Sequence, residues 1–149
     1  MKIKVINLIL IILLIGCSKS KFGREEKILT DFLKSDSFLT SKKCVVIIPS
    51  YGCGICTQDI IAFSKNNFEN EKVLFIYSPY DKTKSLEFKK IIGFEETIAK
   101  DRKSELISLG LVDNKPFAYF IENNKIQEII KFDDSTSNDI IEKIELSIK

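Results

Sequence analysis

The 149-residue sequence contains no histidine. Without imidazole, the chain has no Ser-His or Cys-His nucleophile pair and no imidazole base for general base catalysis. Most zinc and copper sites in proteins also depend on histidine. The absence therefore turns attention to the four cysteines, Cys17, Cys44, Cys53 and Cys56.

Beyond its first few residues, the chain also lacks an excess of charge of either sign. Two of its 23 Lys and Arg residues, Lys2 and Lys4, belong to the N-terminal segment, which leaves 21 basic against 21 acidic residues. A neutral chain lacks the basic surface that nucleic acid requires. We expect no nucleic-acid partner.

The N-terminal segment has the pattern of a secretory signal. Two lysines precede a mostly apolar run over residues 5–16, which is too short for the ~20 residues of a membrane-spanning helix. The end of this run, Leu14-Ile15-Gly16-Cys17, resembles the bacterial lipobox, in which the cysteine is lipidated. We expect a signal peptide over 1–16, a lipidated Cys17 and tether over 17–25, and one folded domain over 26–149. An ordinary cleaved signal or a short anchor is the alternative.

A lipidated Cys17 would place the protein in the cell envelope, anchored to a membrane and facing away from the cytoplasm (the periplasm in a Gram-negative cell). Outside the cytoplasm, two cysteines close in sequence favour disulfide chemistry. Cys53 and Cys56 form one CxxC motif, and a distant Cys44 cannot complete a four-sulfur zinc site, which usually needs a second CxxC. We therefore expect no metal site.

Apolar periodicity predicts helices and strands in alternation. Helical spacing predicts helices over about 25–33 and from Cys53 to the Asn66-Asn67 break. Continuous β-branched or apolar runs predict buried strands over 45–48 and 73–77.

The second half is predicted to end in a hairpin and a helix. Polar stretches over 82–91 and 95–108 are predicted to be helical. Residues 116–122 and 126–132 flank Asn123-Asn124 as an antiparallel hairpin, and 135–148 forms an amphipathic helix. The order predicts an α/β fold with a mixed central sheet and helices on both faces.

These features together resemble the thioredoxin superfamily. A buried strand runs into Cys53-Gly54-Ile55-Cys56 at the start of a helix, and Pro116 opens the hairpin about sixty residues later. The resemblance covers roughly residues 25–149. It implies a thioredoxin-like three-layer sandwich and a cis-proline at Pro116 lying against the cysteine pair.

The resemblance implies a thiol–disulfide oxidoreductase. A helix N-terminus favours the thiolate of Cys53, which would attack a substrate disulfide, and Cys56 one turn later would resolve the mixed disulfide. Tyr51, Lys115 and Pro116 are the expected substrate-binding residues, and the Lys115 cation would lower the pKa of Cys53. No diffusible cofactor is required. The expected partners are protein thiols or disulfides and a protein that recycles the redox state.

Several residues depart from the thioredoxin pattern. Gly52 and Ile55 replace the family's Trp and Pro, and Ile47 replaces its buried aspartate. These departures leave open a non-catalytic binding or scaffold lipoprotein, or a static disulfide in place of a reactive one. A one-cysteine peroxidase ranks last, because the arginine and threonine expected near Cys53 are missing. Cys44 is expected to be a small buried apolar residue without a redox role.

Overall fold

The computed structural model describes residues 20–52, 54–80, 99–101 and 103–149. In chain order its elements are α2 (Gly23–Leu33), α3 (Ser37–Ser41), β1 (Cys44–Pro49), α4 (Gly54–Asn67), β2 (Val73–Ser78), β3 (Ala99–Lys100), α6 (Glu105–Ser108), β4 (Phe117–Glu122), β5 (Lys125–Lys131) and α7 (Ser137–Ile148). α2 begins three residues before the expected domain boundary at residue 26. That boundary stays a prediction.

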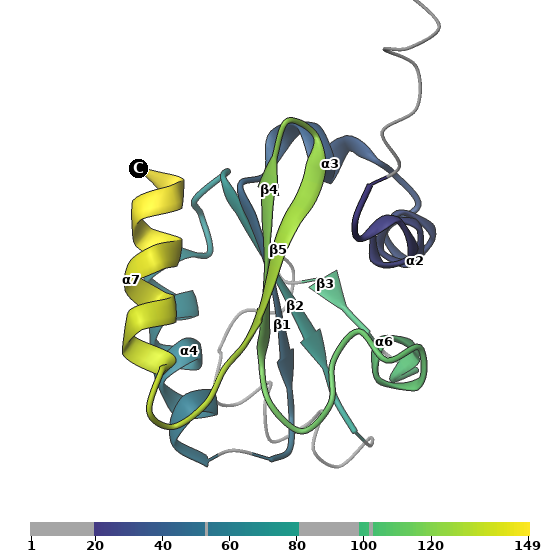
Figure 1. Cartoon of the computed structure of the whole chain (residues 1–149). Coiled ribbons are helices and arrows are strands. Elements are labelled where there is room, and N and C mark those ends of the chain that lie inside the picture. The colour runs from purple at the N-terminus through teal and green to yellow at the C-terminus, as the bar shows by residue number, and fades with distance from the viewer. Residues whose placement is uncertain (1–19, 53, 81–98, 102) are drawn as a thin grey trace, which may run out of the picture.

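Within the described residues, the strands form one mixed five-stranded sheet in the order β3-β2-β1-β4-β5 (Figure 1). β1 pairs in parallel with β2, and β2 in parallel with β3, whereas β4 runs antiparallel to both β1 and β5. A parallel pair linked through a helix and followed by a hairpin is the arrangement that the sequence predicts.

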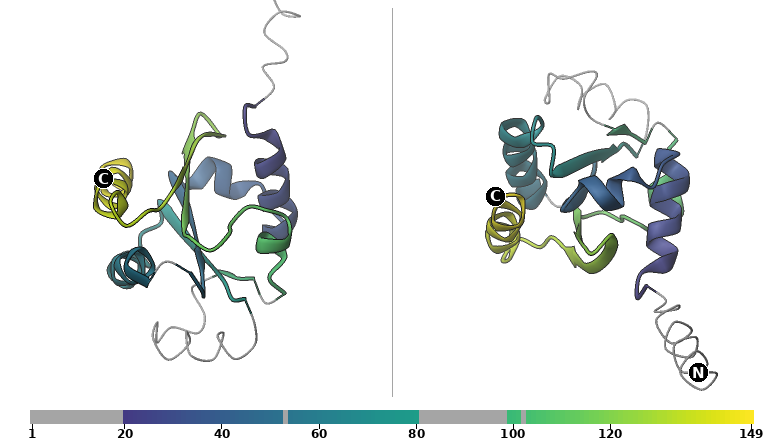
Figure 2. Two further views of the ribbon diagram at one scale, coloured as in Figure 1. Left: turned by 60° about the horizontal axis from the view of Figure 1, so that its bottom comes forward. Right: turned by 90° about the horizontal axis from the view of Figure 1, so that it is seen from above.

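Helices cover both faces of this sheet, so the molecule has three layers. α4 and α7 lie together on one face, and α2 and α6 lie on the other (Figure 2). β1 is central, and all six of its residues are buried. Its side chains alternate between the faces: Val46 and Ile48 join the hydrophobic cluster beneath α4 and α7, and Val45 and Ile47 join the cluster beneath α2. The predicted three-layer α/β sandwich is confirmed.

The predicted hairpin is also confirmed. Asn123 and Asn124 connect β4 to β5 with φ values of 53° and 61°, the left-handed conformation that two-residue hairpin turns require and that Asn tolerates. The final helix begins at Ser137 and not at Ser135.

One predicted helix is wrong over part of its length. Residues 99 and 100, inside the helix predicted over 95–108, form strand β3 beside β2, and of the described residues in this stretch only Glu105–Ser108 is helical. The parallel edge of β2 offers backbone partners that a polar, weakly periodic sequence does not reveal. The helix predicted over 82–91 lies outside the described residues.

The sequence also gave no sign of α3, a five-residue helix whose Phe38 is buried. Among the residues that the structure describes, no helix is long and apolar enough to cross a membrane.

Candidate functional site

The candidate site lies where β1 runs into α4, at the carboxyl end of the parallel strands (Figure 1). Ser50 continues the pairing beyond β1, since its N–H donates to the carbonyl of Ser78 at 3.1 Å. Its hydroxyl oxygen accepts the N–H of Tyr80 at 2.7 Å. Cys53 itself lies outside the described residues, but the structure describes Gly52 before it and Gly54 after it.

Gly52 brings a second loop against this connection. Its φ is +125°, and a Cβ built on it would lie 1.6 Å from the carbonyl oxygen of Asn114. Only glycine leaves room for an approach this close and adopts this backbone conformation without strain. The loop that leads to Pro116 therefore packs directly against the residue before Cys53.

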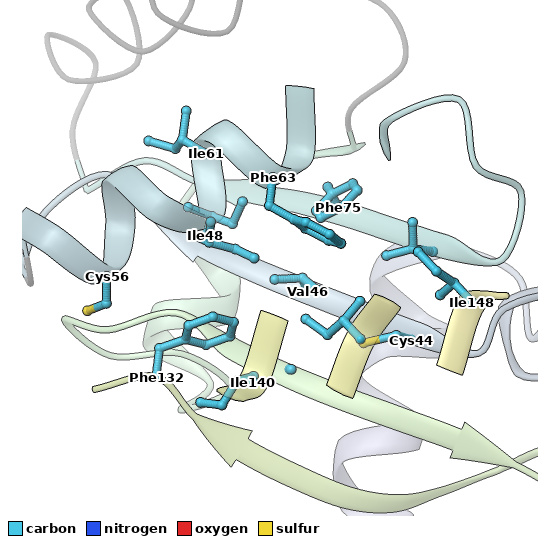
Figure 3. Close-up of a cluster of buried hydrophobic side chains, with 14 of the residues drawn as sticks. Cys44, Val46, Ile48, Cys56, Ile61, Phe63, Phe75, Phe132, Ile140 and Ile148 are labelled. Atoms are coloured by element: carbon cyan, nitrogen blue, oxygen red, sulfur yellow. The ribbon is translucent and has the colours of Figure 1, made fainter. Parts of the chain in front are cut away.

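Cys56 lies in the first turns of α4 and is fully buried. It belongs to the hydrophobic cluster that contains Ile48, Phe132 and Ile140, and its side chain points from α4 toward the interior (Figure 3). Cys56 is disulfide-bonded. Between the two cysteines of the motif, Ile55 is 61% exposed. The motif therefore joins an exposed turn to a buried sulfur.

Pro116 is buried at the start of β4, and its carbonyl accepts the N–H of Phe132 at 2.9 Å. The prediction of a cis-proline is wrong in this structure, because no peptide bond between described residues is cis. The trans form is favoured for X–Pro bonds by ~0.5–1 kcal/mol. A proline that opens a strand also needs no N–H of its own, so an extended trans peptide fits there.

Lys115 precedes Pro116 and is held by two acidic side chains. Its N–H donates to a carboxylate oxygen of Asp113 at 2.9 Å, and its ammonium group lies 3.4 Å from Asp133. The pKa of Asp133 is lowered, first by hydrogen bonds from the N–H and hydroxyl of Ser135 and then by Lys115. The Lys115 cation therefore has a carboxylate partner, and its effect on Cys53 stays a prediction.

Tyr51 forms an exposed aromatic pair beside the site. Its ring centroid lies 5.2 Å from that of Tyr80, and the two side chains are 56% and 60% exposed. With Ile55, they give the edge of the site an apolar surface. Tyr80 was missed by the sequence interpretation, because nothing in a single tyrosine after β2 indicates a contact with the loop after β1.

Two further residues follow the sequence interpretation. Ile47 is fully buried in the cluster beneath α2, so an aliphatic group fills the position of the thioredoxin aspartate. Cys44 is a buried free thiol. Burial raises its pKa far above the ordinary range, and the hydrogen bond from the backbone of Tyr119 opposes this only partly. Such a thiol stays protonated and unreactive near neutral pH.

Asp101 is a second residue that sequence reasoning missed. Its side chain is buried at the same end of the sheet and accepts the hydroxyl of Ser78 at 2.7 Å. It also accepts the backbone N–H groups of Glu105 at 2.7 Å and Leu106 at 2.9 Å. Asp101 thus caps α6 and ties it to β2. Because the sequence predicts a single helix over 95–108, it gives no reason to expect a helix cap at residue 101.

No family model and no curated protein sequence matches the chain. Solved structures do. A candidate thiol:disulfide interchange protein DsbE from Chlorobium tepidum superposes with a TM-score of 0.51 and 18% identity, over 76% of this chain and 84% of that one. A secreted Mycobacterium tuberculosis disulfide oxidoreductase homologous to E. coli DsbE gives a TM-score of 0.50 and 13% identity, over 72% and 84%.

The chain has the thioredoxin-like fold. At these identities the similarity concerns the fold, and the chemistry has to be argued from the residues. In this thioredoxin-like chain, the CxxC motif follows the central strand, and the loop containing Pro116 packs against it. Gly52, which follows the predicted site residue Tyr51, meets Asn114, which precedes the predicted residues Lys115 and Pro116. The predicted residue Cys56 is fully buried.

Proposed function

We propose that this thioredoxin-fold protein is a thiol–disulfide oxidoreductase of the cell envelope, anchored to a membrane through a lipid on Cys17. The observation that carries the proposal is the state of Cys56, a fully buried and disulfide-bonded cysteine next to an exposed Gly54-Ile55 turn. With Cys53 as the partner of Cys56, this disulfide would have one sulfur next to the exposed start of α4 and one protected from solvent.

Cys53 is the proposed nucleophile. At the start of α4, unpaired backbone N–H groups and the positive end of the helix dipole would stabilise its thiolate. The thiolate attacks one sulfur of a substrate disulfide, forms a mixed disulfide and releases the other substrate sulfur as a thiolate. Cys56 then loses its proton and attacks the sulfur of Cys53, which releases the second substrate thiolate. The substrate gains two electrons and the Cys53–Cys56 pair loses two.

The same steps in reverse oxidise a dithiol substrate, so a redox-recycling partner sets the direction of the reaction. The exposed Tyr51 and the backbone around Lys115 and Pro116 are the proposed substrate-binding groups. Their support is the close approach of Asn114 to Gly52, which brings this loop beside the motif. An extended substrate segment lying along the loop would present its own cysteine to Cys53.

The test is the reduction potential of residues 20–149, equilibrated in glutathione buffers. We expect a reversible two-electron transition that is lost in Cys53→Ser and in Cys56→Ser and is unchanged in Cys44→Ala, the matched control with a buried thiol outside the motif. A potential near about −270 mV would indicate a reductant, and one near about −120 mV an oxidant. A pair that stays in one state across all buffers would contradict the proposal.

A trapping experiment tests the two cysteine roles separately. Cys56→Ser leaves the nucleophile without its resolving thiol, so mixed disulfides with protein substrates should accumulate on Cys53. Cys53→Ser should accumulate none, because the remaining sulfur is buried. Equal trapping by the two variants would show that the assignment of roles is wrong.

A non-catalytic binding lipoprotein is the second candidate, and Ile47 is the observation that favours it. A fully buried isoleucine stands where thioredoxins have the aspartate that helps move protons around the inner thiol. The redox titration separates the candidates, since a scaffold requires no accessible two-electron transition.

A further inference from the structure

The folded domain begins close to the expected lipid site. The hydroxyl of Ser20 donates to Glu26 Oε1 at 2.6 Å, and the same carboxylate oxygen accepts the N–H of Ile126 at 2.7 Å. Ser20 is thus fixed, through Glu26, to the first residues of β5. Only three residue steps separate Ser20 from Cys17, and three extended residues span at most ~11 Å.

This attachment lies at the opposite end of the sheet from the CxxC motif. Ile126 pairs with Ile121 near the end of β4, and Phe120 pairs with Cys44 at the start of β1. The motif follows the other end of β1, beside Pro116. Five residue steps lead from Pro116, just before β4, to Ile121, which at ~3.4 Å per residue is about 17 Å along the strand. Figure 1 shows the β4–β5 turn at the top and the β1–α4 connection at the bottom.

The end near Ser20 also gathers lysines, which we call the lysine end. Its members lie at the starts of β1, β2 and β5 and at the end of α7: Lys42, Lys43, Lys72, Lys125 and Lys149. Hydrogen bonds connect several of them. The Lys42 ammonium donates to the Glu71 carbonyl at 2.7 Å, and the Lys72 ammonium donates to the Lys149 carbonyl at 2.6 Å. Acidic residues also lie at this end, among them Glu69 and Glu71 before β2 and Glu122 at the end of β4.

Among the described residues of the CxxC end, two lysines are paired with carboxylates. Lys115 pairs with Asp133, and Lys131 pairs with Asp113. Exposed Asp134 and Asp139 lie nearby in the chain, before and within the first turn of α7. An anionic lipid surface attracts lysines and repels carboxylates within about one Debye length. The short tether and the charge distribution therefore favour the same orientation.

We propose that the lysine end of the domain docks on an anionic membrane surface and that the CxxC end faces away from it. This inference rests on the lipidation of Cys17 in the proposed function. It identifies the partners as soluble proteins, or as domains that project from the membrane, and it excludes a cysteine pair buried within the bilayer.

The experiment uses the full lipidated chain in phosphatidylglycerol-containing vesicles with a small fraction of nickel-chelating lipid. In a Cys53→Ser/Cys56→Ser background, a nitroxide is attached to Glu122→Cys at the lysine end or to Ile55→Cys at the CxxC end. Both positions are exposed, and Cys44 is buried. We expect the nickel-induced relaxation enhancement to be severalfold larger at position 122 than at position 55.

Charge-reversed variants test the lysine end. Lys42→Glu/Lys72→Glu should lower the contrast between the two labels severalfold, whereas Lys103→Glu, an exposed lysine remote from that end, should leave it unchanged. Circular dichroism confirms that each variant folds. Equal relaxation enhancement at positions 122 and 55 would overturn the proposed docking surface. So would an undiminished difference between the two positions in Lys42→Glu/Lys72→Glu.

The result is independent of the redox proposal, because the labelled chains lack the CxxC thiols. An unacylated Cys17, detected by mass spectrometry, would overturn the orientation and leave the thiol-exchange assay unaffected. A chain without a redox transition would overturn the oxidoreductase and leave the measured orientation standing.

Discussion

At the scale of single residues, Gly52 and Gly54 flank the proposed nucleophile but meet different surroundings. A Cβ at Gly52 would overlap the Asn114 carbonyl, whereas a Cβ at Gly54 would meet no atom within 4 Å. We expect Gly52→Ala to lower the free energy of unfolding by ~2–4 kcal/mol through clash and backbone strain. Gly54→Ala should be neutral or stabilising by up to ~1 kcal/mol, since alanine is the better helix former.

Urea denaturation of the two variants, both in the oxidised form, measures this difference. Gly54→Ala serves as the matched control, because it adds the same methyl group two residues away. Similar stabilities for the two variants would mean that the 114–116 loop does not pack against Gly52 as described.

The buried thiol of Cys44 makes stability depend on alkaline pH. Burial raises its pKa in the folded chain, so the folded state keeps a proton that the unfolded chain loses above about pH 8.5. The free energy of unfolding should therefore fall as pH rises beyond that value, with a contribution from Cys44 of up to ~1.4 kcal/mol per pH unit. Below that pH this contribution is constant.

The comparison of interest is between the native chain and Cys44→Ala, measured by denaturation from pH 7 to 10. The variant should lose less stability across the alkaline range, while the raised pKa of the buried Tyr119 phenol acts alike in both chains. Parallel curves for the two chains would contradict a protonated Cys44 in the folded state.

Single residues also show what the sequence could reveal about the site. Cys53 and Cys56 stand out because the spacing of a CxxC motif is local in sequence. The contacts of Tyr80 with Tyr51 and of Asn114 with Gly52 join segments about 30 and 60 residues apart, so no local pattern signals them. The trans bond before Pro116 likewise depends on how the loop packs.

At the scale of secondary-structure elements, Asp101 connects the end of β2 to the start of α6. In the described part of the stretch predicted to be a helix over 95–108, it lies between strand β3 and the short helix α6. Its carboxylate has three donors, two of them backbone N–H groups of α6. We expect Asp101→Ala to lower the free energy of unfolding by ~2–4 kcal/mol, because buried donors lose a charged acceptor.

Asp101→Asn is the matched variant, since its amide oxygen can still accept one of these hydrogen bonds. It should cost less than the alanine substitution. Thermal unfolding ranks the three chains, and hydrogen exchange at Glu105 and Leu106 shows whether α6 has lost its cap. Unchanged exchange in Asp101→Ala would contradict the capping role.

The elements also differ in how well their patterns predict them. The runs of β1 and β2 are continuous and apolar because both faces of the sheet are covered, and these strands were predicted to within one or two residues. β3 has two residues, too few for any period to appear. α3 is likewise too short for a helical pattern beyond its buried Phe38.

At the scale of the whole molecule, the fold follows from the order of the strong elements. A buried parallel pair with a helix between its strands, then a hairpin and a helix, allows few arrangements of a mixed sheet. The end at which the motif lies follows from the same order. The positions of Ser20 and Glu26 do not, because they depend on a contact between residues 26 and 126.

That contact has a consequence for self-association. β5 is an edge strand, and an exposed edge invites strands of other molecules to pair with it. Here Glu26 occupies the N–H of Ile126, the β4–β5 register is interrupted between Phe120 and Ile121, and Lys125 and Lys131 stand at the two ends of the strand. The opposite edge, β3, has two residues. Molecules crowded together on one surface thus have little opportunity to join their sheets.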